Sequence, residues 1–253
     1  MFALRSLRIN VISNICINTV GLSKQFSTSR ILPNFYGPPK GDESLIKRIA
    51  RKLGWGEVSK GALKLSGYKL YMKIADEIEY KNFFEVCDME DTFASWFSII
   101  ELHVWMFSAR LMEDKGEGKI VRNSMIQAMW EDSDMKSKKL EGAVASARRK
   151  QIGLLNQGFH AALISYDEGL LGNDKVLAGA LWRRFLKAKE PANQEELLKQ
   201  IVALEMLVLY VRYQFKVLNS LSREKLIRYQ EFQFVPFNKQ LFELAEKNRN
   251  IIP

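Results

Sequence analysis

The amino-acid sequence predicts an all-α fold with a single multi-helix domain, and three observations support this. Apolar residues recur at steps of three and four over most of the chain after residue 41, which is the period of a helix. The alternation typical of strands is confined to the short segment 231–237. Glycine, proline and small polar residues lie between the periodic segments, where helices begin and end.

The clearest helix is predicted over residues 91–112, and the other helices are expected to pack around it. One face of this segment is apolar and largely aromatic: Phe93, Trp96, Phe97, Ile100, Val104, Phe107 and Leu111. Further apolar residues flank that face, so the helix belongs inside a domain or inside a membrane. Glu101 and His103 near its middle favour a domain, because an acid at the bilayer centre costs about 3 kcal/mol. Trp96 is expected to be buried.

The remaining elements are placed by the same periodicity and by capping residues. Gly153 and Gly158 would weaken their helix by about 1 kcal/mol each, so they are expected to admit a close neighbouring helix. Phe232 and Phe234 belong to an extended segment before the last short helix, which begins at Asn238. The expected helices cover residues 42–53, 68–79, 91–112, 119–131 and 194–221, with two more between the last two of these. One of the two begins at Arg149 and is terminated by residues 167–169, and the other is capped by Asn173 or Asp174 and ends before Pro191.

The longest predicted helix, residues 194–221, carries a seven-residue apolar pattern. Its seam consists of Leu197, Ile201, Leu204, Val208, Val211, Phe215 and Leu218. Such a seam packs either against the other helices of the same domain or against a partner in a coiled-coil-like contact. Leu209 and Tyr213 lie off the seam, so apolar residues occupy more than one face.

The first 30 residues have the composition of a mitochondrial transit peptide. Residues 1–41 contain five of the 38 Lys and Arg residues and no Asp or Glu, so the charge of the remaining chain falls from +9 to +4. A merely basic tail is the alternative, and Ser13 and Asn14 interrupt the apolar run that a secretory signal requires. We expect a transit peptide over 1–30, a proline-rich linker over 31–41 and the helical domain over 42–253.

A second basic segment lies between Lys136 and Lys150. It contains six Lys and Arg residues and one acid, Glu141. A solvated surface explains most such segments, whereas RNA phosphates or an anionic membrane would also favour it. Single-stranded RNA binding usually adds aromatic residues for base stacking, and this segment has none.

No catalytic or metal-binding pattern is evident. The chain has no glycine-rich phosphate loop, and its only histidines, His103 and His160, are not preceded by the Glu at three residues that a di-iron bundle uses. Glu101 and His103 are two residues apart and point to different helix faces. The two cysteines do not suffice for a zinc site, and Asp167 and Glu168 fit a turn. We therefore expect a binding protein, not an enzyme, without cofactor or metal.

Several uncommon sequence words, in one order, resemble the ubiquinol–cytochrome c chaperone family. They are DTFASWF at 91–97, LHVWM at 102–106, MWED at 129–132, YDEG at 166–169 and LAGALWR at 177–183. The resemblance covers residues 68–221 and extends to Phe232-Gln233-Phe234 and Pro236. It implies a role in assembling the cytochrome bc1 complex, respiratory complex III. The implied partners are newly made cytochrome b, a small helical assembly factor, the mitochondrial ribosome and the matrix face of the inner membrane.

The resemblance carries no catalytic residues, so the candidate site residues are contacts. Leu209 and Tyr213 are the candidates for the small helical partner or the client. The candidates for ribosome or membrane contact are Lys138, Lys139, Arg148 and Arg149. An RNA- or ribosome-binding translation factor is the alternative function, and a di-iron oxidase acting on quinone is a distant third.

Overall fold

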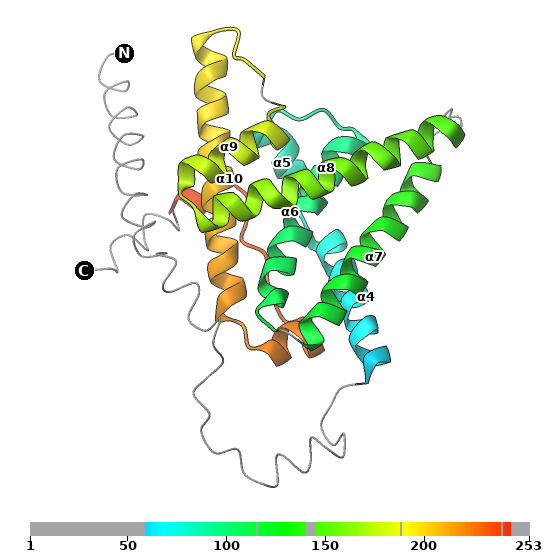
Figure 1. Cartoon of the computed structure of the whole chain (residues 1–253). Helices are drawn as coiled ribbons and strands as arrows, with labels where there is room; N and C mark the ends of the chain where they lie inside the picture. Colours follow the sequence, from blue (N-terminus) through cyan, green and yellow to red (C-terminus); the bar gives the residue numbers. More distant parts are fainter. Residues whose placement is uncertain (1–58, 115, 140–144, 188, 239, 244–253) are drawn as a thin grey trace, which may run out of the picture. The chain divides into compact units, whose positions relative to one another are not determined.

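The computed structural model describes residues 59–243 apart from 115, 140–144, 188 and 239 (Figure 1). The predicted transit peptide, linker and first helix therefore lie outside the described residues. All regular secondary structure among the described residues is helical, with no strand, which confirms the all-α prediction. Its elements are α4 (Lys60–Glu77), α5 (Tyr80–Val86), α6 (Phe93–Met112), α7 (Glu117–Lys138), α8 (Ala145–Leu171), α9 (Asp174–Phe185), α10 (Gln194–Ser220) and the π-helical turn η1 (Lys225–Tyr229).

The chain divides into two compact units, of which the main unit comprises residues 58–166 and 178–253. The smaller unit contains 167–177 among its described residues. There α8 ends at Leu171 and Asn173 caps α9, because its side-chain Oδ1 accepts hydrogen bonds from the amides of Lys175 and Val176. The sequence had placed the end of α8 at Gly169, two residues too early.

Helix α6 is the centre of the main unit, as its apolar sequence predicts. Thr92 caps its first turn by accepting a hydrogen bond from the Ser95 amide at 3.2 Å. In Figure 1 the helix lies between α10 and α7, and it also contacts α4 and α5. Trp105 is fully buried against Tyr166 and Phe215. Trp96, in contrast, is only half-buried, so its predicted core position is wrong.

Helices α4 and α7 form the closest pair of the unit, and Gly67 makes that approach possible. A Cβ atom on Gly67 would lie 2.4 Å from the Val121 carbonyl oxygen and 2.7 Å from the Ser124 Cβ. Helix α4 begins at Lys60 and runs through Gly67, although the sequence favours a start at Tyr68.

The glycines singled out from the sequence are not the ones at the closest helix contacts. A Cβ on Gly153 would meet no atom within 4 Å, and on Gly158 it would meet only the Arg184 guanidinium at 3.5 Å. Helix α5 was also missed by the sequence reasoning. It has seven residues and one buried side chain, Phe83, and so shows too little periodicity.

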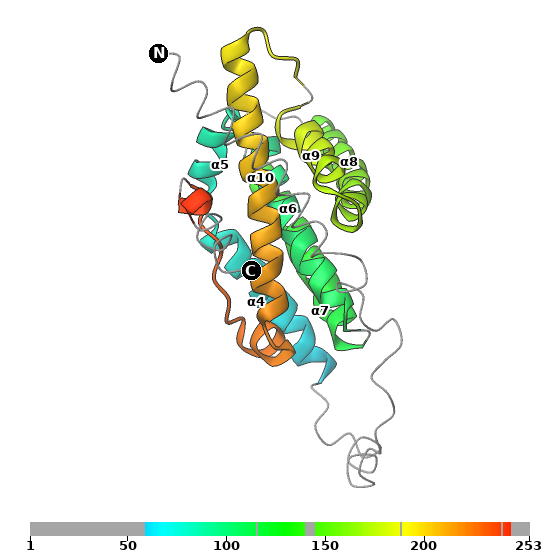
Figure 2. The ribbon, with the colours of Figure 1, turned by 90° about the vertical axis from the view of Figure 1, so that its left-hand side faces the viewer.

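The chain after α10 returns along the helices as an extended segment, residues 231–237, as predicted (Figure 2). Lys73 on α4 donates a hydrogen bond to the Gln230 carbonyl at 2.8 Å, and the Val235 amide donates one to Gln214 on α10 at 2.9 Å. Phe232, Val235 and Phe237 are buried, so this segment closes one side of the core. None of the described helices is long and apolar enough to cross a membrane.

Candidate interaction site

The buried acid of α6, Glu101, is held by an arginine from α9. The Arg184 Nε and Nη2 atoms donate to the two carboxylate oxygens of Glu101 at 2.7 Å each. The Glu101 side chain is 0% exposed and that of Arg184 is 24% exposed. Burial raises the pKa of Glu101 to about 7, although the arginine charge and its hydrogen bonds act in the opposite direction. The pair ties α9 to the central helix.

The histidine of α6, His103, faces α10 instead. Its Nδ1 lies 2.7 Å from the Ile99 carbonyl oxygen and its Nε2 lies 2.6 Å from the Tyr210 hydroxyl. Burial lowers its pKa to about 4, so the ring is neutral in the folded protein near neutral pH. Glu101 and His103 thus point to different neighbours, as their spacing predicts. Within the described residues, no three acids, histidines or cysteines are grouped as metal ligands would be.

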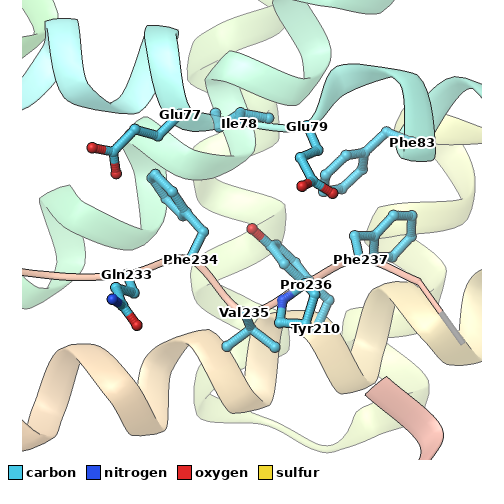
Figure 3. A pocket seen from close by; sticks show the side chains of 10 residues that line it. All are labelled: Glu77, Ile78, Glu79, Phe83, Tyr210, Gln233, Phe234, Val235, Pro236 and Phe237. Carbon is cyan, nitrogen blue, oxygen red and sulfur yellow. The ribbon is translucent and has the colours of Figure 1, made fainter. Parts of the chain in front are cut away.

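A cavity of about 190 Å³ opens where the extended segment passes the junction of α4 and α5 (Figure 3). Its aromatic lining includes Phe83, Tyr210 and Phe237, which pack on one another. Phe83 and Phe237 stack with their ring centroids 4.0 Å apart. Phe234 and Pro236 add further apolar surface. The cavity also has two acids in its lining, Glu77 and Glu79.

The candidate basic contacts lie at the end of α7 and the start of α8. Lys138 and Lys139 are exposed at the last turn of α7, and Lys138 pairs with Asp134 at 2.5 Å. Arg149 is exposed on α8, and the side chain of Arg148 lies outside the described residues.

The half-buried Trp96 lies beside this basic region. The Lys136 Nζ atom lies 4.8 Å from the Trp96 ring centroid, within cation–π distance. The Phe93 ring packs on the same indole, with the two ring centroids 5.4 Å apart. The tertiary structure therefore supplies aromatic groups next to the basic residues, which the segment 136–150 does not contain in its own sequence.

The two candidate partner contacts on α10 are covered to different degrees. Leu209 is 6% exposed and so belongs to the buried residues of the helix. Tyr213 is half-buried, and Lys216 Nζ lies 6.0 Å from its ring centroid. The apolar side chains that α10 does expose, Leu197, Leu198 and Val202, lie near its N-terminal end. The predicted seam is accordingly buried only in its second half.

Sequence reasoning missed two parts of this region. Arg184 follows Glu101 by 83 residues, and no local pattern connects them. The aromatic cavity combines residues from four separate segments, although the Phe232-Gln233-Phe234 alternation did indicate that one side of the extended segment is apolar. Two of the sequence motifs named above are also in contact. Trp105 of LHVWM packs on Tyr166 of YDEG, with the ring centroids 5.0 Å apart.

The chain shares sequence with proteins of one family along most of its length. The family model described as ubiquinol–cytochrome c chaperone matches residues 85–234. Ubiquinol-cytochrome c reductase complex assembly factor 1 of Drosophila melanogaster is 40% identical over 187 residues, which are 72% of this chain and 69% of the relative. The mitochondrial protein CBP3 of Saccharomyces cerevisiae is 27% identical over 172 residues, covering 66% of this chain and 48% of the relative.

A solved structure has the same fold. The crystal structure of the Cbp3 homolog from Brucella abortus matches with a TM-score of 0.55 at 17% identity, over 77% of this chain and 99% of that chain. At this identity the likeness concerns the fold alone.

Fold and site together define an all-helical domain with an aromatic cavity. The buried polar groups of α6 pair with side chains of α9 and α10, while aromatic and apolar groups lie at the surface and in an open cavity. The chain belongs to the ubiquinol–cytochrome c chaperone family.

Proposed function

We propose that the protein is an assembly chaperone for the mitochondrial cytochrome bc1 complex, respiratory complex III. The observation that carries the proposal is the family match over residues 85–234. The names of the relatives support it, since the Drosophila protein is an assembly factor of the ubiquinol–cytochrome c reductase complex and the yeast protein is mitochondrial. The acid-free N-terminus fits import into the matrix.

The client in this proposal is newly synthesised cytochrome b, bound at the matrix face of the inner membrane. A very apolar chain needs a transient apolar cover before it is fully inserted and assembled. Half-buried Phe93 and Trp96, and exposed Leu197, Leu198 and Val202, are apolar groups of the kind that could provide it. This is a chaperone role in which no bond is made or broken by the protein.

A small helical assembly factor is proposed to act with the chain at α10. Leu209 and Tyr213 remain the proposed contacts. Because Leu209 is buried, its polar replacement would also disturb the packing of α10. Tyr213→Ser is therefore the sharper probe, with Tyr229→Ser, at an exposed tyrosine on η1, as the matched control. Loss of partner co-purification in the first variant alone would support this contact.

The experiment that tests the main proposal is removal of the protein from cells. Cytochrome b and assembled complex III, measured by immunoblot and native gel, should fall while cytochrome c oxidase assembly persists. The tagged full chain should also co-purify newly labelled cytochrome b. Normal complex III after complete removal would contradict the proposal.

The basic residues are proposed to contact the mitochondrial ribosome or an anionic membrane. Reversing Lys138, Lys139, Arg148 and Arg149 to Glu should weaken that association without unfolding the domain, because surface substitutions rarely cost more than about 0.5 kcal/mol. Sedimentation with ribosomes and flotation with cardiolipin vesicles distinguish the two surfaces. Association that resists both the reversal and added salt would exclude these residues.

An RNA-binding translation factor is the second candidate, and the position of Trp96 beside Lys136 favours it. A ring next to cationic groups can stack on an unpaired base. RNA affinity should then fall steeply with salt and fall further in Trp96→Leu, measured by fluorescence anisotropy with single-stranded RNA. Binding that is weak at low salt or unchanged in Trp96→Leu would contradict this candidate.

A further inference from the structure

The cavity at the junction of α4 and α5 has two kinds of lining. One part is aromatic and rigid, because Phe83, Tyr210 and Phe237 are almost fully buried and packed on one another. The other part is acidic, with Glu77 at the end of α4 and Glu79 just before α5 (Figure 3). Aromatic faces and carboxylates both attract cations.

The charged and hydroxyl side chains that line the cavity already have partners, but carboxylate oxygens there can still accept a hydrogen bond. The Tyr210 hydroxyl is already bonded to His103 Nε2 at 2.6 Å. Glu77 is partly neutralised by Lys73, whose Nζ lies 3.5 Å from it. Glu79 accepts a hydrogen bond from Asn82 at 2.6 Å, but the described residues place no cation against it. The cavity is therefore net negative on one side and apolar on the other.

The protein holds a cation with the same pair of groups immediately beside the cavity. Lys73 Nζ lies 4.6 Å from the Phe232 ring centroid while it pairs with Glu77. Phe234 follows Phe232 by two residues in the extended segment, and Glu79 follows Glu77, the last residue of α4, by two residues. A second ring and a second carboxylate therefore both line the cavity.

We propose that this cavity binds the side chain of an arginine or lysine from a partner protein. Its volume of about 190 Å³ is below the roughly 300–1,000 Å³ of sites for drug-sized molecules, so it suits one side chain. The apolar stem of that residue would lie against Phe234 and the buried rings, and its charged end would reach Glu79. An acidic side chain would meet Glu79 unfavourably, and an uncharged one would leave that carboxylate without a cation.

Saturation-transfer NMR on the full chain tests this with defined probes. The probes are the N-acetyl amides of arginine, lysine, norleucine and glutamate. Arginine and lysine probes should receive saturation at their side-chain methylenes, and norleucine, which has a similar stem without the charge, should receive about fivefold less. Equal signals for lysine and norleucine would overturn the assignment.

Variants locate the site. Glu79→Gln and Phe234→Leu should each lower the arginine signal about fivefold, whereas Glu85→Gln, at an exposed acid of α5 outside the cavity, should leave it unchanged. An arginine signal that survives both Glu79→Gln and Phe234→Leu would place the binding elsewhere and refute the proposal. Circular dichroism establishes that each variant is folded. The assay contains no cytochrome b, so its result is independent of the assembly function.

The partner itself is sought by photo-crosslinking from Gln233, which is exposed at the cavity, in intact mitochondria. The crosslinked partner segment should contain an arginine or lysine, and the crosslink should weaken in Glu79→Gln but not in Glu85→Gln. Segments without a basic residue, crosslinks insensitive to Glu79→Gln, or no crosslink at all would each contradict a basic partner.

Discussion

At the scale of single residues, α6 keeps two ionisable side chains buried by different means. His103 is neutral and hydrogen-bonded to Tyr210 and to the Ile99 carbonyl. The charge of Glu101 is compensated by Arg184, which donates a hydrogen bond to each of its carboxylate oxygens. A buried polar group costs free energy unless it is paired, so each depends on its particular neighbour. Both arrangements lead to stability predictions.

Because His103 is neutral in the folded protein, we expect the folded state to lose stability at acidic pH. Its pKa is about 4 in the folded protein, against the ordinary 6.5, so the unfolded chain binds the extra proton between these values. The neutral His103 ring contributes about 3 kcal/mol to the free energy of unfolding. This contribution is complete above about pH 6.5 and is lost as the pH falls towards 4. Urea unfolding at stepped pH should show this loss in the wild type and not in His103→Gln.

His160 provides the matched control because it is the only other histidine and is exposed. His160→Gln should keep the wild-type pH dependence. The contribution of Glu101 is common to all three proteins and cancels in the differences. If the free energies of unfolding of the wild type and His103→Gln fall in parallel with pH, then His103 can be protonated in the folded state.

The Glu101–Arg184 pair predicts a large effect of removing one partner. Arg184→Ala should lower the free energy of unfolding by about 3 kcal/mol, because Glu101 is left buried without its cation. Arg183→Ala, at the exposed neighbouring position, should cost less than about 0.5 kcal/mol. The double variant Glu101→Gln with Arg184→Met should recover most of the loss. Similar urea midpoints for Arg184→Ala and Arg183→Ala would contradict a structural role for the pair.

At the scale of elements, the packing of α4 on α7 depends on one glycine, and the same helix offers a control. Gly67→Ala should destabilise by about 1–3 kcal/mol, because its Cβ would overlap the Val121 carbonyl and α7 would have to move. Gly61→Ala has its nearest neighbour, Ser59 Oγ, at 3.9 Å and should be neutral or stabilising by about 0.5 kcal/mol. Thermal unfolding of both variants measures the difference. Equal melting temperatures would show that the helices separate without cost.

Helix α10 combines two roles along its length. From Ala203 to Leu218 its buried side chains face the unit, whereas Leu197, Leu198 and Val202 are exposed. A seven-residue repeat of uniform appearance in the sequence is therefore core in one half and exposed or partly exposed in the other. Periodicity states which residues share a face but not whether a neighbouring element covers it.

At the scale of the whole molecule, the first 30 residues are predicted to act separately from the folded domain. Deleting 1–30 should leave helical content and melting temperature unchanged and abolish import into mitochondria, because the acid-free basic segment is the targeting signal. Import is measured by protease protection with isolated mitochondria. Replacing 1–30 by an unrelated transit peptide should restore import, whereas full import of the truncated chain would contradict the prediction.

The sequence alone determined the helical class, the central position of α6, the limits of α6 and α10 to within two residues, and the start of α9. These features follow from local periodicity and capping, which any segment carries within itself. The same reasoning placed Glu101 and His103 on different faces of α6, because the angle between positions two residues apart in a helix is fixed. Family membership also followed from short words of sequence.

Only the tertiary structure decided what each of these faces meets. It paired Glu101 with Arg184, set Trp96 beside Lys136, buried Leu209 and assembled a cavity from Glu79, Phe83, Tyr210 and the segment 233–237. Each of these contacts joins residues far apart in the chain, and helical periodicity contains no information on such pairs. They arise when whole elements pack, and the closeness of that packing depends on single positions such as Gly67.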